Sequence, residues 1–190
     1  NFSKLKYDQW DVINLWKQFP NVSVCPSLDS WGTRAEYLRT GTKWKLVEEN
    51  LFRLFDELPN VRFSIATTVT AFNVLTLGEF LEYLIEKFNF DTTLHVNFAM
   101  LMSPPAMSIN NLPHSLRQTA LDSIQRVVNK YPNHVVLHEN LNAVQLALTN
   151  GLDSRQPKAN VKRFIDSFDR RRDTSFADTF PELKDWYTSL

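Results

Sequence analysis

Polar side chains follow three predicted strands, at the points where those strands end. The first group runs from Ser27 to Ser30 and continues to Arg39, the second runs from Thr70 to Asn73, and the third is Met102 and Ser103. Parallel α/β proteins bind ligands beyond the carboxyl ends of their strands, so these hydroxyl, amide and guanidinium groups could hold a polar ligand. The same residue types also cap turns and form surface ion pairs, and their spacing leaves both roles open.

The elements that would position these groups alternate between strand and helix. Apolar residues at helical spacing predict helices over 44–58 and 77–88, the second beginning at Thr76 in capping-box register with Glu79. Apolar and β-branched runs predict strands over 22–28, 61–69 and 94–101, with Pro26 at an irregular end of the first. This alternation predicts right-handed βαβ units in a parallel sheet covered by helices, and hence an α/β fold.

The flanking segments are predicted to be mainly helical. Tyr7, Trp10, Ile13 and Trp16 recur at near-helical spacing and predict an amphipathic helix over 7–19. Helices are also expected over 116–131 and 161–168, with a short strand at 135–137 and a helix at 141–148. The aromatic residues of 164–190 indicate a packed C-terminal appendage.

Composition excludes several classes of protein. The 190 residues carry 21 Lys and Arg against 21 Asp and Glu, so nothing favours capture of nucleic acid or an anionic membrane. Four glycines leave no Walker loop and no GxGxxG fingerprint, and the single cysteine allows no internal disulfide, which fits a cytoplasmic protein. The uncharged stretch 92–116 contains three prolines and several asparagines, so we expect a strand and loop there instead of a membrane span.

The histidines and the cysteine favour structural interpretations. His95 lies inside an apolar strand, where we expect a core or barrel-lumen position, and a lumen position would let it touch substrate. His134 and His138 would suit a metal only on a shared helix, which Val135 and its β-branched neighbour disfavour, so no metal is assigned. Cys25 is predicted to be a small buried residue of the first strand.

Ser27-Leu28-Asp29 ends a predicted strand and is followed by a loop with Arg34 and Arg39. This string resembles the strand ending in Ser-(Leu/Ile)-Asp of the radical S-adenosylmethionine (radical SAM) enzymes, in particular of the subgroup with a twitch-type or related C-terminal extension. The stretch 69–74, ending near Asn73, resembles the family's following strand, and 164–171 with 180–183 resembles the closing segment of the subgroup. The resemblance spans most of the chain.

The resemblance implies a fold, a cofactor and a set of binding residues. The fold would be the later βα units of a partial (β/α)6 TIM-like barrel over 1–110, with a mainly helical C-terminal extension over 111–190. Ser27 would hydrogen-bond the ribose or carboxylate of S-adenosylmethionine, Arg39 would pair with its carboxylate, and Asn73 would reach cofactor or substrate. The alternatives from the residues themselves are an Arg39–Glu36 surface pair and a turn-capping Asn73.

The family's cluster motifs do not occur in this chain. A [4Fe–4S] cluster needs the CxxxCxxC loop, and the Gly-Gly-Glu motif that holds the cofactor's amino group is also absent. We therefore expect an N-terminal cluster-binding half as partner, with this chain alone not catalytically competent. In the complete protein the cluster would cleave S-adenosylmethionine to a radical that modifies a substrate the sequence does not identify. The alternative is a non-catalytic α/β binding or scaffold module.

Overall fold

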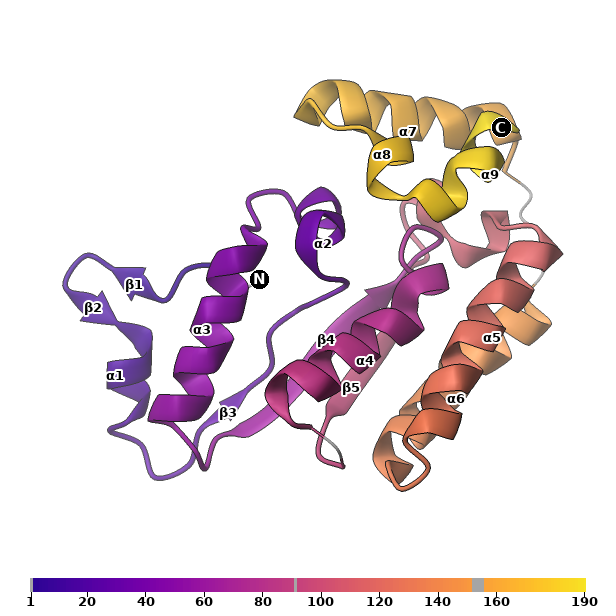
Figure 1. The fold of residues 1–190 in the computed structure, drawn as a ribbon. Coiled ribbons are helices and arrows are strands. Elements are labelled where there is room, and N and C mark those ends of the chain that lie inside the picture. Colours follow the sequence, from indigo (N-terminus) through magenta and orange to yellow (C-terminus); the bar gives the residue numbers. More distant parts are fainter. Residues whose placement is uncertain (1, 91, 152–155) are drawn as a thin grey trace.

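Strand β4 (Arg62–Val69) is the centre of a three-stranded parallel sheet. Strand β3 (Ser23–Val24) pairs with its start, and β5 (His95–Met100) pairs with it from Ser64 to Val69 (Figure 1). The computed structural model describes residues 2–90, 92–151 and 156–190, and within these residues the sheet stays open and closes into no barrel. The predicted α/β class with parallel strands is confirmed.

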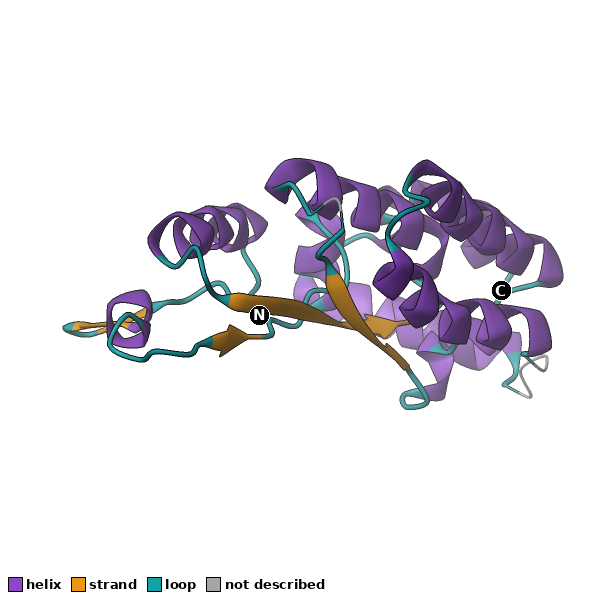
Figure 2. Cartoon of the chain, turned by 90° about the horizontal axis from the view of Figure 1, so that it is seen from below, coloured by secondary structure: helices purple, strands orange, loops and turns teal. Residues whose placement is uncertain are grey.

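Consecutive strands are neighbours in the sheet, and helices make the connections between them. Helices α2 (Gly32–Leu38) and α3 (Trp44–Glu57) connect β3 to β4, and α4 (Leu77–Phe88) connects β4 to β5. Right-handed crossovers in such an order place their helices on one face of the sheet. Figure 2 shows α3 and α4 on the same side of the strands. The helices predicted over 44–58 and 77–88 are confirmed.

Helix α4 begins at Leu77 with Thr76 at the N-cap position, as predicted, but the expected capping box is absent. Thr76 ends a short 3₁₀ turn, Val74–Thr76, and its side chain makes no capping bond to the helix. Its hydroxyl instead lies 3.4 Å from the carbonyl oxygen of Asn73. The turn satisfies the backbone at this end of α4, so the capping box with Glu79 does not form.

The two faces of the sheet differ in chemistry. On the helix-covered face, Ile65, Thr67, Val69 and Val96 are buried. The opposite face presents small and polar residues, of which these are exposed or half-buried: Ser23, Cys25, Ser27, Ser64, Ala66, Thr68, His95, Asn97 and Ala99. We call this the open face. Cys25 is therefore exposed and not buried as predicted, because its side chain points away from the helices.

The N-terminal segment is not the predicted helix over 7–19. It forms a hairpin of β1 (Lys6–Tyr7) and β2 (Trp10–Asp11), followed by the short helix α1 (Val12–Trp16). Asp8 turns the hairpin at φ 51°, and the Asp11 carboxylate accepts a hydrogen bond from the backbone N–H of Asn14 and caps α1. Spacing alone did not reveal that turn.

The C-terminal half adds helices to the same core. Those helices are α5 (His114–Lys130), α6 (Val135–Asn150), α7 (Lys158–Arg172), α8 (Phe176–Thr179) and α9 (Lys184–Thr188). Short 3₁₀ turns at Pro105–Met107 and Ile109–Asn111 precede α5, and another at Pro181–Leu183 joins α8 to α9. The predicted strand at 135–137 is wrong, because Leu137 and Leu141 lie one turn apart on the buried side of α6. No helix among the described residues is both long and apolar enough to cross a membrane.

Candidate functional site

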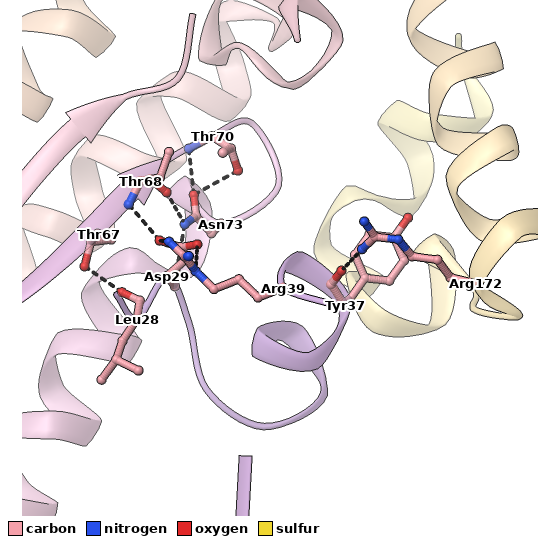
Figure 3. A network of polar contacts seen from close by, with 9 residues as sticks. All are labelled: Leu28, Asp29, Tyr37, Arg39, Thr67, Thr68, Thr70, Asn73 and Arg172. Carbon is pink, nitrogen blue, oxygen red and sulfur yellow. Dashed lines mark hydrogen bonds and ion pairs between the residues drawn. The ribbon is translucent and has the colours of Figure 1, made fainter. Parts of the chain in front are cut away.

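Asp29 lies at the centre of a polar cluster beyond the ends of β3 and β4 (Figure 3). Its Oδ2 accepts a hydrogen bond from Nε of Arg39 at 2.6 Å, and its Oδ1 accepts one from Nη2 at 3.1 Å. The same Oδ1 accepts a bond of 2.7 Å from the backbone N–H of Thr68, at the end of β4. The Asp29 side chain is only 9% exposed, whereas that of Arg39 is 33% exposed. The pair therefore has a buried anchor and a guanidinium that reaches solvent.

Asn73 joins the ends of the two strands. Its Nδ2 donates to the carbonyl oxygens of Asp29 at 2.8 Å and Thr68 at 2.9 Å. Its Oδ1 accepts from the backbone N–H of Thr70 at 2.8 Å and from the hydroxyl of Thr70 at 3.1 Å. Asn73 is 1% exposed, so its amide is both buried and fully engaged with protein atoms. Within the structure it organises the loops that carry Asp29.

Ser27 lies beside this cluster, on the open face. It forms a parallel bridge with Ala66, and the next residue, Leu28, is buried on the helix side with its carbonyl bonded to the Thr67 hydroxyl at 2.7 Å. The structure thus brings Arg39 and Asn73 together through Asp29. Ser27 precedes Asp29 by two residues and lies on the open face, beside this group.

The expected alternative pair, Arg39 with Glu36, does not form. Glu36 Oε1 instead accepts a 2.8 Å hydrogen bond from the backbone N–H of Trp44, the first residue of α3. The carboxylate is used to satisfy the start of that helix, which leaves Asp29 as the partner of Arg39. The sequence did not predict Asp29 as the partner of Arg39. The signal for this pair was an acidic residue at the end of a strand and an arginine shortly after it in the chain.

The open face continues the site along the sheet. His95 and Asn97 project from β5, and Asn97 Nδ2 lies 4.0 Å from the sulfur of Cys25. His95 is exposed on this face, so a core position for it is wrong, and its expected place in a barrel lumen stays a prediction. Met102 and Ser103, the third predicted group, are exposed beyond the end of β5 and take no part in the hydrogen bonds around Asp29.

The described residues do not fit an iron–sulfur cluster. They contain one cysteine and no group of three or more His, Cys, Asp or Glu side chains placed to hold a metal ion. His134 has no exposed surface and accepts a hydrogen bond from the backbone N–H of Leu94 at 3.2 Å, while His138 lies 2.9 Å from the carbonyl oxygen of Tyr131. Both histidines therefore bond to the backbone.

No protein-family model, curated protein sequence or solved structure matches the chain.

Proposed function

We propose that this chain is the C-terminal part of a radical SAM enzyme and forms the later βα units of a partial (β/α)6 barrel with a helical extension. The observation that carries the proposal is the one-sided sheet. Helices bury one face, and the other presents hydroxyl, amide, thiol and imidazole groups among small residues. Parallel sheets are generally covered on both faces, so a polar open face calls for an explanation.

A barrel wall provides that explanation. When consecutive parallel strands are neighbours and their helices lie on one side, the sheet curves toward closure with the helices outside. The open face then lines the interior, where short polar side chains leave room for a ligand. The cluster around Asp29 lies at the carboxyl ends of the strands, which is the end where such barrels bind their ligands.

S-adenosylmethionine suits the groups at this end of the sheet. The exposed edge of the Arg39 guanidinium would hold the cofactor's carboxylate, and the hydroxyl of Ser27 would bond to its ribose or carboxylate. Asn73 is already engaged with protein atoms on both sides of its amide, so we assign it to shaping the site. The cofactor supplies radical chemistry when it is bound beside a [4Fe–4S] cluster. We place that cluster in an N-terminal partner half, and we place the complete enzyme in the cytoplasm.

Formation of 5′-deoxyadenosine tests the proposal directly. The complete protein would be reconstituted anaerobically with iron and sulfide, reduced, and supplied with S-adenosylmethionine. We expect 5′-deoxyadenosine from the wild type and a loss of about tenfold or more in cofactor affinity for Arg39→Gln. Arg126→Gln, an exposed arginine on α5, is the matched control and should behave as wild type. Absence of both cofactor binding and cleavage in the wild type would refute the proposal.

One observation favours a second candidate, a non-catalytic α/β binding or scaffold module. The charge of Arg39 already has a partner in Asp29, as expected for a structural ion pair. In that case Arg39→Gln would lower the free energy of unfolding, and no variant would alter binding of S-adenosylmethionine. The experiment above therefore separates the two functions.

A further inference from the structure

The ring of Tyr37 fixes helix α2 against the C-terminal helices. Tyr37 is 2% exposed, and its ring centroid lies 5.1 Å from those of Phe168 in α7 and Phe180, and 6.1 Å from that of Phe176 in α8. Aromatic rings at these separations combine area burial with favourable ring geometry. The side chain of Tyr37 is thus enclosed by segments far away in the sequence.

Two polar links act on the same helix. Arg172, the last residue of α7, donates from Nη1 to the carbonyl oxygen of Tyr37 at 2.9 Å (Figure 3). Arg34, near the start of α2, forms an ion pair of 2.9 Å with Glu182. The Arg172 guanidinium also lies over the ring of Phe168, 3.5 Å from its centroid. Both ends of α2 are therefore attached to the C-terminal segment.

Helix α2 needs such attachments. It has seven residues, and a helix this short is not stable without tertiary contacts. Arg39 follows it immediately and donates its backbone N–H to the carbonyl of Ala35 at 3.0 Å. Two residues later Gly41 turns the chain at φ +81°, a conformation that glycine adopts without strain. The backbone of Arg39 is consequently oriented by α2 on one side and a tight turn on the other.

We infer that the C-terminal helical segment, residues 158–188, positions Arg39 through α2, with Tyr37 and Arg172 as the positioning residues. Asp29 holds the guanidinium from the sheet, and the C-terminal segment holds the backbone from which that side chain extends. The effect of this arrangement on cofactor binding rests on the proposed function of Arg39. The positioning of Arg39 does not depend on that function, so positioning and cofactor binding are tested separately.

The test compares two neighbouring arginines in the full protein. Arg172→Gln removes the donor to Tyr37, whereas Arg171→Gln makes the same charge change at an exposed residue whose Nε bonds only within its own helix, to the carbonyl oxygen of Ser167. Hydrogen exchange at Nε of Arg39, followed by ¹⁵N NMR, reports the Arg39–Asp29 bond without reference to activity. Affinity for S-adenosylmethionine is measured on the reconstituted protein. Glu182→Gln, which weakens the second link, provides an independent variant.

We expect Arg172→Gln to speed exchange at Arg39 Nε and to weaken cofactor binding by about tenfold, with Arg171→Gln unchanged and Arg172→Lys partly restoring both. Unchanged exchange in both Arg172→Gln and Glu182→Gln would overturn the inference, even if the wild type bound the cofactor. Faster exchange in a protein that binds no S-adenosylmethionine would support the positioning role and refute the proposed function.

Discussion

Arg39 and Asp29 meet through two hydrogen bonds of 2.6 and 3.1 Å, although ten positions and a complete helix separate them in the chain. The carboxylate is buried and also bonds to the backbone of β4, so the pair connects the loop after β3 to the centre of the sheet. A bidentate pair restrains the guanidinium plane as well as its position. The site thus has a rigid cation at the edge of the open face.

Replacing Asp29 tests how much this pair contributes. Asp29→Asn keeps the shape but removes the charge that Arg39 faces, so we expect the free energy of unfolding to fall by about 1–3 kcal/mol. Urea unfolding of both proteins gives the difference. Asp122→Asn, at an exposed position on α5, is the control and should change stability by less than about 0.5 kcal/mol. Equal effects of the two substitutions would show that the pair adds nothing.

Replacing the Asn73 amide by a carboxylate should destabilise the protein. Asn73→Asp would place an oxygen against the carbonyls of Asp29 and Thr68, where the amide nitrogen now donates, in a position that is 1% exposed. We expect a loss of about 2–4 kcal/mol in unfolding free energy, larger than for the exposed control Asn129→Asp. Thermal or urea unfolding measures both variants, and a small effect at Asn73 would mean that its bonds are replaced by water.

Stability should decrease in mild acid because of His134. Burial lowers the pKa of this imidazole below its ordinary value of 6.5. The unfolded state then binds the proton more readily, so the free energy of unfolding falls as the pH drops below about 6.5 toward the folded-state pKa. Urea unfolding between about pH 5 and about pH 8 should show this slope, and His134→Gln should reduce it. An identical slope in the variant would assign the effect to another group.

Gly78 should not accept a larger side chain. A Cβ built at this position lies 2.5 Å from the backbone oxygen of Ser123 and 2.6 Å from its hydroxyl, where α4 and α5 approach closely. Gly78→Ala is therefore expected to destabilise the protein by about 1–3 kcal/mol through displacement of α5. Glu79→Ala, one residue further along α4 and exposed, is the control for the unfolding measurement. If Gly78→Ala is neutral or stabilising, the two helices are not in fixed contact.

The sequence predicts the central elements well because their patterns follow burial. Val47, Leu51 and Leu54 lie on one side of α3, and Ile65, Thr67 and Val69 on one side of β4, as the two periodicities require. The N-terminal helix was wrong because Tyr7 and Trp10 satisfy helical spacing while pairing across a hairpin, and a turn at Asp8 leaves no strong sequence signal. The spacing of apolar residues shows which side of an element is buried, but it does not show where the chain reverses direction.

The candidate site was predictable only in part. Ser27, Arg39 and Asn73 were predicted from their positions after strands, and they lie in one region of the structure. Their bonding partners were not found, because the partner of Arg39 depends on the path of the loop through Trp31 and α2. Proximity in sequence favours Glu36 for Arg39, but the unsatisfied N–H at the start of α3 binds that carboxylate. The Glu36 carboxylate therefore binds a backbone N–H in place of the Arg39 guanidinium.

The alternation along β4 and β5 has a consequence for mutational tolerance. Ile65, Thr67, Val69 and Val96 are buried beneath the helices, whereas the residues between them are exposed or half-buried on the open face. Substitution of Ile65 or Val96 by a polar residue disturbs the core. At Ala66, which lies between Ser27 and Asn97, folding would survive a bulky replacement that blocks access to the polar groups beside it. Adjacent positions in these strands therefore carry separate constraints, one on folding and the next on whatever molecule occupies the polar side.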